Sequence, residues 1–338
     1  MTFDKWYEKN YKKVLIIPAV LLVLAVLYIG FFYVEHGDII YKDVSLTGGT
    51  SFGVQTDFSA KDLEGALLDK GFSDFSVKAV SDGSGNHIQV IVTVSEAETE
   101  GMQEAIEDVL GFGLTDENSS IEFTDSSLSD DFFKQLMIAV ILAFFWMAAV
   151  VFVIFAKGVK LKVWTVIGNL AFAFFLGYYF FALNSVLSII IFLVFAAIFI
   201  RTYVKYSVPA FAVMLSAFAD IVLTLAVVDL IGMRLSTAGI VAFLMLIGYS
   251  VDTDILLTTR VLNKRESTNK ALYGALKTGI TMSVTSIIAV TTALIVVYSF
   301  MSVLNQIFTI LLIGLGFDLF STWIANASIL KWYAEEKL

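Results

Sequence analysis

The sequence contains no cysteine and only two histidines, His36 and His87, among its 338 residues. The absence of cysteine excludes disulfides, thiol catalysis and cysteine-ligated metal. Two histidines do not predict a zinc or haem centre, and both are interpreted as surface residues. The sequence also lacks a GxxxxGK[ST] phosphate-binding loop and an HExxH helix. With no evident nucleophile–base set, the sequence predicts neither an enzyme nor a bound cofactor.

Charge is scarce as well. Charged residues make up 16% of the chain and hydrophobic residues 58%. Long apolar runs cause this imbalance and predict an α-helical membrane protein with eight spans. The run at 186–201 gives the weakest span, because only 15 residues precede Arg201, so a short or partly re-entrant helix is expected there. The eight spans are expected at residues 14–34, 135–156, 163–183, 186–201, 208–230, 236–259, 279–298 and 304–330.

Most of the negative charge lies between the first two spans. Residues 35–134 contain 21 acidic residues and 5 lysines, so this stretch carries −16 and the rest of the chain +7. We interpret the acidic block as a solvated surface, which argues against nucleic acid as a partner. The predicted division is therefore a cytosolic N-terminus with the first span (1–34), a soluble domain (35–133), and a membrane bundle with a short cytosolic C-terminus (134–338).

The soluble domain shows the pattern of an α+β fold. "DVSLTGGTSFGVQT" predicts a strand and "SAKDLEGALLDKGF" a helix. Two further strands, "FSVKAV" and "HIQVIVTV", are separated by the turn-rich "SDGSGN". An acidic helix, "SEAETEGMQEAIEDVLGFG", and a last strand, "SIEFTD", complete the domain. The order β-α-β-β-α-β predicts a ferredoxin-like fold.

The distribution of lysine and arginine predicts the topology. If the N-terminus is cytosolic, 16 of the 22 basic residues fall on the cytosolic side. This asymmetry predicts that both termini are cytosolic and that residues 35–133 lie outside the cell, which requires an even number of spans. The cytosolic set is Lys5, Lys9, Lys12, Lys13, Lys157, Lys160, Lys162, Arg201, Lys205, Arg260, Lys264, Arg265, Lys270, Lys277, Lys331 and Lys337.

Carboxylates inside the apolar runs are the candidate functional residues. An ionised carboxylate at bilayer depth costs about 2.5–3.5 kcal/mol on insertion scales. Asp220 and Asp318 are central in their spans, and Asp252 lies seven or eight residues before the cytosolic end of its span. Because such residues are costly, we predict an ion-coupling role, and the membrane gradient is then the source of energy. The alternative is that the charges only hold helices together and never titrate.

The stretch "IGYSVDTDILLTTR" adds Asp254 and Arg260 to this set. Asp252 and Asp254 point about 200° apart on a helix, so the two cannot share a proton. Arg260 lies about 12 Å from Asp252 along the helix and reaches either the interface or a carboxylate on another helix. Thr281 and Thr285, at helical spacing, and Asn326 near Asp318 suggest a polar path through the membrane, although such residues also serve packing.

Several stretches together resemble the SecF family, the smaller half of the SecD–SecF complex of protein secretion. "SLTGGTSF" resembles the family's (Asp/Ser)-Phe-(Thr/Lys)-Gly-Gly-Thr motif, with Leu46 in place of the usual aromatic residue. "VPAFAVMLSAFADIVLTLA" and "IGYSVDTDILLTTRVLNKR" resemble its third and fourth membrane segments, the latter in a form similar to the archaeal branch. "KTGITMSVTSIIAV" and "GFDLFSTWIANASILKWY" resemble the fifth and sixth. The resemblance covers the first 56 residues and about 205–333, whereas an additional pair of helices near 157–201 departs from the family's six spans.

The resemblance implies an RND-superfamily bundle in the cytoplasmic membrane. It implies that Asp220 is the conduction-associated aspartate, with Arg260 as its electrostatic counterpart, and that Asp252 and Asp254 occupy further charged positions of the family. It also implies H⁺ as the coupling ion, with Na⁺ an open alternative. The expected partners are SecD, a SecY-type channel, an unfolded secretory polypeptide and membrane lipid. The residues expected to join the outer domain to the membrane are Gly48, Gly49 and Thr50.

Two other functions compete with this interpretation. One is a small-molecule or lipid exporter of the same superfamily, against which the small outer domain argues. The other is a non-conducting assembly factor for membrane proteins, in which the buried charges only hold helices together. Replacing Asp220 by asparagine would be harmless in an assembly factor and severe in an ion-coupled protein.

Overall fold

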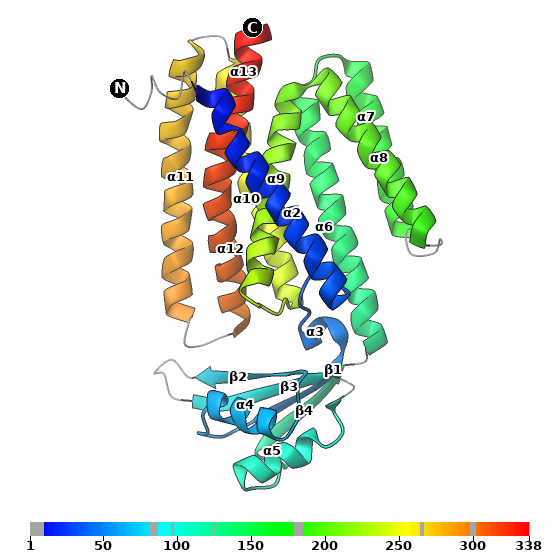
Figure 1. The fold of residues 1–338 in the computed structure, drawn as a ribbon, viewed down its shortest axis with the longest axis vertical. Coiled ribbons are helices and arrows are strands. Elements are labelled where there is room, and N and C mark those ends of the chain that lie inside the picture. The colour runs from blue at the N-terminus through cyan, green and yellow to red at the C-terminus, as the bar shows by residue number, and fades with distance from the viewer. Residues whose placement is uncertain are drawn as a thin grey trace.

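The computed structural model describes residues 10–81, 87–95, 98–124, 126–178, 185–263, 267–297 and 302–337. Lys5, Lys9, Lys264 and Arg265 of the predicted charge asymmetry, and the predicted turn at 82–86, lie outside the described residues. A helical bundle and a small α+β domain are stacked along the long axis of the molecule (Figure 1). Both ends of the described chain lie at the end of the bundle opposite to the domain.

Within the described residues, eight helices are long and apolar enough to cross a membrane, as predicted. The last of the eight runs without a break from α12 through a π-helical segment into α13. The helices are α2 (Ile16–His36), α6 (Ser126–Phe155), α7 (Val159–Tyr178), α8 (Ser185–Tyr206), α9 (Val208–Leu230), α10 (Thr237–Leu262), α11 (Thr268–Val297), α12 (Ser302–Phe320), the π-helix (Ser321–Asn326) and α13 (Ala327–Lys337).

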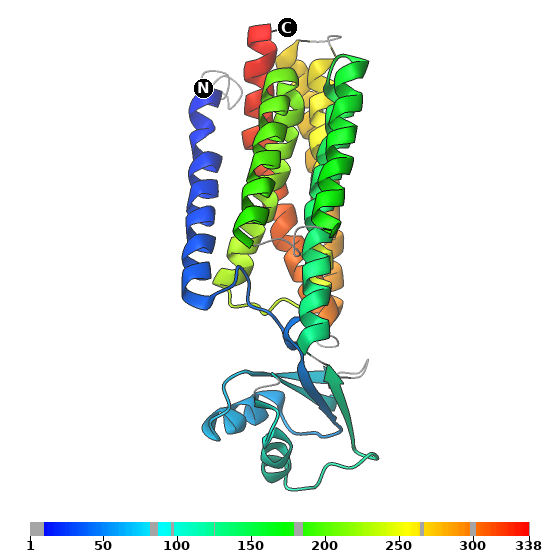
Figure 2. The same ribbon diagram turned by 90° about the vertical axis from the view of Figure 1, so that its right-hand side faces the viewer.

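The domain has the predicted ferredoxin-like topology. Its strands form one antiparallel sheet in the order β2-β3-β1-β4, so the first strand is central and pairs with β3 and β4. Helices α4 and α5 cover the face of the sheet that points away from the bundle (Figures 1 and 2). The elements are β1 (Gly49–Val54), α4 (Ala60–Asp69), β2 (Phe75–Ser81), β3 (His87–Ser95), α5 (Met102–Leu110) and β4 (Ser119–Thr124).

Alternation along the central strands forms the core of the domain. Every second side chain of β1 and β3 faces the helices, because successive residues of a strand point to opposite faces. The buried set is Phe52, Val54, Val90, Val92 and Val94 from the strands, and Leu63, Leu67, Met102 and Ile106 from the helices. The opposite face of the sheet carries hydroxyl groups, including those of Ser51 and Thr93, and faces the bundle.

The junction between domain and bundle is a short helix followed by two glycines. Helix α3 (Val44–Thr47) packs against α6 and buries Leu46. Gly48 and Gly49 have φ angles of 79° and 146°, which disfavour residues with a Cβ atom. Thr50, in β1, is buried and lies 3.1 Å from the Thr99 hydroxyl. The two glycines therefore occupy backbone conformations that few other residues adopt, between the membrane bundle and β1.

Several helices are longer than predicted, among them α11, which begins at Thr268, eleven residues before the expected span. Helix α6 begins at Ser126, eight residues before the predicted bundle, and its outer turns carry ion pairs from Lys134 to Asp130 and Asp131. These i,i+3 and i,i+4 pairs support a helix that continues beyond the apolar run. Helix α8 has 22 residues and continues past Arg201. The expectation of a short or re-entrant segment was wrong, because the basic residues of its last turns are part of the helix.

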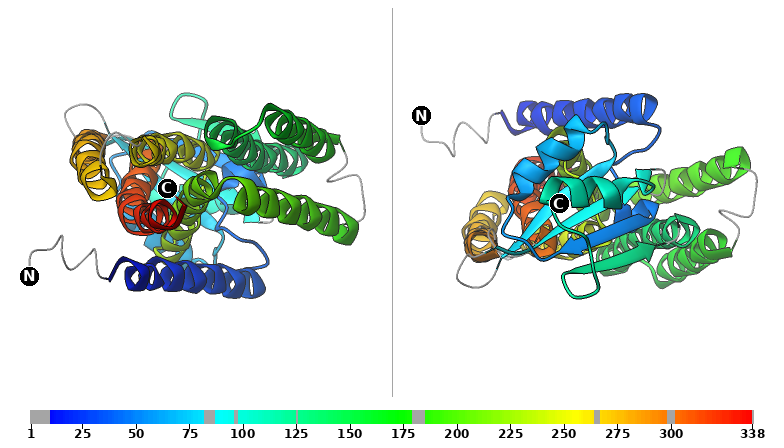
Figure 3. Two further views of the ribbon diagram at one scale, coloured as in Figure 1. Left: turned by 90° about the horizontal axis from the view of Figure 1, so that it is seen from above. Right: turned by 90° about the horizontal axis from the view of Figure 1, so that it is seen from below.

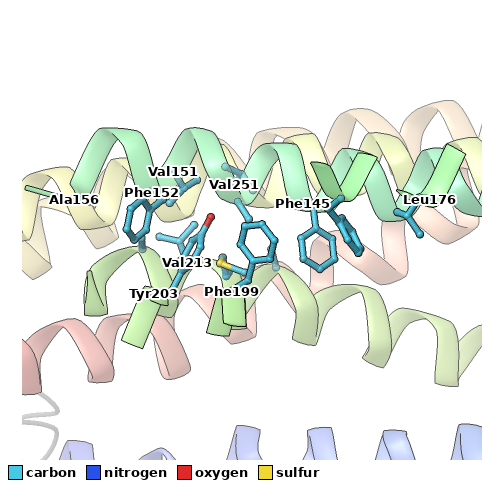
Figure 4. Close-up of a cluster of buried hydrophobic side chains, with 14 of the residues drawn as sticks. Phe145, Val151, Phe152, Ala156, Leu176, Phe199, Tyr203, Val213 and Val251 are labelled. Atoms are coloured by element: carbon cyan, nitrogen blue, oxygen red, sulfur yellow. The ribbon is translucent and has the colours of Figure 1, made fainter. Parts of the chain in front are cut away.

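The additional pair of helices, α7 and α8, packs at one side of the bundle (Figures 1 and 3). Its contacts with α6, α9 and α10 are almost wholly apolar and aromatic (Figure 4). Phe145 of α6 lies 4.4 Å from Phe172 and 5.4 Å from Phe199, measured between ring centroids. Tilted and edge-on aromatic pairs of this kind add to the energy of burial. The pair therefore extends the bundle sideways and packs against α6 and α9.

Candidate functional site

Three carboxyl groups are buried together in the middle of the bundle. Asp220 of α9 and Asp254 of α10 have no exposed surface, and Asp318 of α12 is 1% exposed. The sequence analysis named all three, Asp220 and Asp318 from their central positions in apolar runs and Asp254 from the charged stretch at 247–260. The structure brings them into one hydrogen-bonded cluster.

Asp220 is held by two hydroxyl groups. Ser250 of α10 donates to Oδ2 at 2.5 Å, and Ser321 donates to Oδ1 from the other side. Both serines are buried. Asp220 therefore connects α9 to α10 and to the segment that follows α12.

Asp254 and Asp318 share one hydroxyl group. Thr322 Oγ1 lies 2.9 Å from Asp254 Oδ1 and 3.3 Å from Asp318 Oδ1. Asn326 donates its amide to Asp254 at 2.6 Å, and the Thr253 hydroxyl lies 3.1 Å from Asp318 Oδ1. The three carboxyl groups are thus linked through side chains of α10 and of the segment after α12.

The shared hydroxyl makes the cluster sensitive to protons. A threonine hydroxyl has one proton, so Thr322 donates to only one carboxylate at a time. If Asp254 and Asp318 are both ionised, only one of them receives the Thr322 proton. The other carboxylate oxygen then faces the Thr322 oxygen, and both atoms are acceptors. A carboxylic acid could instead donate to the Thr322 oxygen. Adding or removing one proton therefore changes which of the two carboxyl groups accepts from Thr322.

The cluster has no basic partner in the described part of the chain. None of the salt bridges found there reaches Asp220, Asp254 or Asp318. Negative charges buried without a partner are strongly unfavourable. The arrangement therefore requires added positive charge, either protons or a small cation.

Part of the cluster carries oxygen atoms that form no hydrogen bond of ordinary geometry within the described residues. Asp254 Oδ2, Asn326 Oδ1 and Thr258 Oγ1 are buried without a hydrogen bond. Asn326 is bonded to Asp254, and Thr258 lies one helical turn from it. These acceptors around one carboxylate offer a suitable environment for a proton carrier or for a monovalent cation.

Among the described residues, a π-helical segment supplies four of the seven side-chain hydrogen bonds to the carboxylates. In Ser321–Asn326 the helix widens, and the Ala327 N–H donates to the Thr322 carbonyl five residues earlier. Ser321, Thr322 and Asn326 all lie in this segment and all bond to a carboxylate. Single π-turns inside α-helices are frequent at functional sites. The sequence analysis included Asn326 but missed Ser321 and Thr322, because a change of helical pitch leaves no mark in an apolar pattern.

A glycine of α11 provides space for this segment. A Cβ atom on Gly279 would collide with the indole of Trp323, which lies in the π-helix. The absence of a side chain thus lets α11 approach the segment closely, as small residues do between membrane helices.

Apolar clusters close the site at both ends. The cluster on the side of the domain is formed by Leu235, Phe243, Leu246, Ile310 and Leu311. The cluster on the opposite side is formed by Leu257, Val261, Leu272 and Leu330. Because these side chains fill the space between α10, α12 and α13 above and below the carboxylates, the structure represents an occluded state of the cluster.

Two of the predicted charges lie away from the cluster. Asp252 is exposed on the face of α10 opposite to Asp254, as its spacing requires. Arg260 is also exposed and donates to the Gly274 carbonyl of α11 at 2.7 Å. It lies ten residues beyond Ser250, the partner of Asp220, and therefore about 15 Å away along the helix. The structure does not support Arg260 as the direct counterpart of Asp220.

The predicted threonine path is not part of the cluster either. Thr281 and Thr285 are exposed on α11 and donate to the carbonyls of Lys277 and Thr281, at 2.8 and 2.7 Å. Hydroxyls bonded to their own helix are satisfied without a path. Only Asn326 of the three residues predicted for this path joins the carboxylates.

The sequence GTSFG at 49–53 matches the GxSxG pattern of a hydrolase nucleophile elbow, but the backbone structure of these residues does not match one. Ser51 lies in the middle of β1, between Thr93 and Glu122 on the neighbouring strands. A nucleophile elbow requires a sharp turn from a strand into a helix. The stretch is therefore a strand, and this serine gives no support to a hydrolase.

The sequence of this chain is similar to that of archaeal export proteins along its whole length. The family model described as "Protein export membrane protein SecD/SecF, C-terminal" matches residues 176–336. A relative from Methanocaldococcus jannaschii named "Protein-export membrane protein SecF" is 31% identical over 97% of this chain and 97% of its own. A relative of the same name from Haloferax volcanii is 32% identical over 95% of this chain and 91% of its own. These alignments leave no room for a long insertion, so relatives of this length also contain the segment of α7 and α8.

The fold is also similar to that of solved structures. A crystal structure of SecDF, a translocon-associated membrane protein from Thermus thermophilus, superposes with a TM-score of 0.56 at 15% identity. The alignment covers 98% of this chain and 38% of the SecDF chain. A second SecDF structure, in a super-membrane-facing form, gives a TM-score of 0.51 and covers 97% of this chain and 39% of that chain. Both comparisons concern the arrangement of the helices and the domain.

Proposed function

Because the chain belongs to the SecF family of protein-export membrane proteins, we propose that it is an accessory subunit of the Sec export machinery that uses an ion gradient. It acts with SecD, beside a SecY-type channel in the cytoplasmic membrane, on an unfolded polypeptide that emerges outside. Both termini are cytosolic, the α+β domain is extracytosolic, and lipid surrounds the outer helices. No cofactor is required besides the coupling ion, which is H⁺, with Na⁺ as the alternative.

The buried carboxylate cluster is the observation that carries this proposal. Three acidic groups without a basic partner hold together α9, α10, α12 and the π-helix. A protein that needed only to join these helices would do so at lower cost with neutral side chains. The cluster suits a site whose charge changes during a cycle.

The cycle follows from the hydrogen bonds. In the occluded state the added positive charge satisfies the cluster, and the apolar clusters on both sides are closed. Loss of a proton toward one side leaves carboxylates that repel one another, so the contacts through Ser321 and Thr322 must rearrange. The π-helix and α12 then move relative to α9 and α10, and the outer domain moves with them. A domain that changes position outside the membrane prevents an emerging chain from sliding back.

The test is retention of a translocating precursor in vesicles that contain this chain, SecD and the channel. Under an imposed proton gradient, wild type should increase the fraction of precursor that stays outside. Asp220→Asn should reduce it to the level of vesicles without this chain, because a neutral amide cannot cycle. Asp252→Asn is the matched control, since Asp252 is exposed and outside the cluster. Equal retention with wild type and Asp220→Asn would refute the proposal and favour an assembly factor.

A further inference from the structure

Gln306 lies in the first turns of α12, at the end of the bundle that faces the domain. The oxygen and the nitrogen of its side-chain amide both form hydrogen bonds with the loop between α9 and α10. The Nε2 group donates to the Arg234 carbonyl at 2.5 Å, and Oε1 accepts from the Ser236 N–H at 3.1 Å and from its hydroxyl at 2.5 Å. One neutral side chain thus fixes this loop to α12.

The close approach depends on Gly239 in the first turn of α10. A Cβ atom at this position would lie 2.9 Å from Gln306 Oε1 and 2.5 Å from a methyl group of Leu235. Ser236 is the N-cap of the same helix and accepts from the Gly239 N–H. The first turn of α10 therefore packs closely against the Gln306 amide.

The same loop holds the outer domain. Leu235 exchanges backbone hydrogen bonds with the connector from α2: its N–H donates to Tyr41 at 2.6 Å, and its carbonyl accepts from Asp43 at 2.8 Å. Arg234 forms an ion pair of 3.0 Å with Asp74, in the turn between α4 and β2. Glu98 holds that turn by accepting the backbone N–H groups of Ser73 and Asp74. An unbroken series of contacts therefore runs from α12 through the loop into the domain.

The other half of α12 reaches the carboxylate cluster. Asp318 lies twelve residues after Gln306, about 18 Å along one continuous helix. The loop held by Gln306 joins α9 and α10, which carry Asp220 and Asp254. A shift of α12 relative to these two helices must therefore either break the Gln306 bonds or move the loop.

We propose that Gln306 is a positioning residue that transmits rearrangement of the buried carboxylates to the outer domain. This inference rests on the proposed ion-coupled function. The amide moves the loop at 231–236 with α12, and Arg234 moves the domain with the loop. A cleft of about 510 Å³ between the domain and the bundle, lined by Glu64, Arg234, Asn305 and Gln306, gives the domain room to move.

Spin-label distances provide the test, and the chain's lack of cysteine allows specific labelling. Labels at Glu35→Cys, at the end of α2, and at Lys61→Cys, in α4, report the position of the domain; both sites are exposed. The protein is the full chain reconstituted with SecD. The distance distribution is compared with and without Asp220→Asn, in the wild-type background and in Gln306→Leu. Asn305→Leu is the matched control, because within the described residues that amide hydrogen-bonds only to Thr309 of its own helix.

We expect Asp220→Asn to shift the distance in wild type and in Asn305→Leu, and the shift to be lost in Gln306→Leu. Gln306→Glu is the second variant; it keeps the acceptor but loses the donor to Arg234, and its shift should also be lost. In vesicles, Gln306→Leu should conduct ions like wild type yet lose precursor retention. If Asp220→Asn shifts the label distance as much in Gln306→Leu as in wild type, the inference about Gln306 is wrong, whereas the ion-coupled function is unaffected. No shift in wild type would overturn the ion-coupled function and this inference with it.

Discussion

At the scale of single residues, the hydroxyl of Thr322 decides how the cluster responds to charge. It is the contact shared by Asp254 and Asp318, at 2.9 and 3.3 Å. A shared donor with one proton cannot satisfy two carboxylates together. The side chain that distributes this proton is therefore as important to the site as the carboxylates.

Thr322→Val tests this role. The change keeps the shape but removes one donor from the buried carboxylates, which then keep only Asn326 and Thr253 at these two oxygens, so we expect a loss of about 1–3 kcal/mol in stability and loss of ion-coupled activity. Thr322→Ser should retain most of both. Thermal unfolding in detergent and precursor retention in vesicles are the measurements. Thr281→Val, on the exposed face of α11, should change stability by less than about 0.5 kcal/mol; a similar loss at both threonines would show that the effect is not specific to the cluster.

The sequence predicts acidic residues in this site better than neutral ones. Asp220, Asp254 and Asp318 stand out because a carboxylate in an apolar run has a high energetic cost. Ser250, Ser321 and Thr322 do not, since hydroxyls are common in membrane helices and usually bond to their own backbone. The resemblance implied Arg260 as the electrostatic counterpart of Asp220, but the distance along α10 prevents direct contact.

At the scale of elements, the π-helix is the segment where the regular α-helical geometry of the last span is interrupted. It places Ser321, Thr322 and Asn326 toward α9 and α10 within a single turn. The positions of spans follow from hydropathy, so all eight were predictable. A widened turn depends on packing against neighbours such as Gly279, which hydropathy does not report.

Gly279→Ala tests the close packing of α11 against the π-helix. The added Cβ would meet the Trp323 indole, so the segment must shift, and we expect a loss of about 1–3 kcal/mol from overpacking. Gly316→Ala is the matched control, because a Cβ there meets no atom within 4 Å. It should be neutral or stabilising by up to about 1 kcal/mol. Thermal unfolding of both variants gives the comparison, and equal stability of the two would contradict this account of the close packing.

The turn between α4 and β2 carries a pH dependence of its own. Backbone hydrogen bonds from Asp74 and Ser73 hold the pKa of Glu98 below its ordinary value of 4.5. A pKa that is lower in the folded domain means that the carboxylate stabilises the turn above about pH 4.5, and that this contribution is lost as the pH falls through the lowered value. We therefore expect the turn at 73–74, which holds the Arg234 ion pair, to loosen in acid.

Hydrogen exchange of the segment containing Ser73 and Asp74, corrected for the intrinsic effect of pH, measures this loosening. Glu98→Gln should remove the pH dependence and leave exchange fast at neutral pH. Glu107→Gln is the control: Glu107 also has a lowered pKa, from its bond to the Leu114 N–H, but it does not contact this turn. A turn that loosens in acid to the same extent in Glu98→Gln as in wild type would contradict the assignment.

At the scale of the whole molecule, the buried carboxylates and the outer domain lie in separate parts of the fold. The carboxylates are closed between two apolar clusters inside the bundle, whereas the domain lies beyond the end of the bundle. The β-α-β-β-α-β order of the domain was evident in the sequence, because each element has its own periodicity. How the domain is attached was not, because the contacts of Arg234 and Gln306 join residues distant in the sequence.

Ion flux through the reconstituted pair of this chain and SecD tests the central claim most directly. A proton gradient is imposed on vesicles, and internal pH is followed for wild type, Asp220→Asn and Asp252→Asn. The account predicts that wild type and Asp252→Asn dissipate the gradient and that Asp220→Asn holds it as empty vesicles do. Flux that persists undiminished in Asp220→Asn would contradict the claim that the buried cluster is the coupling site.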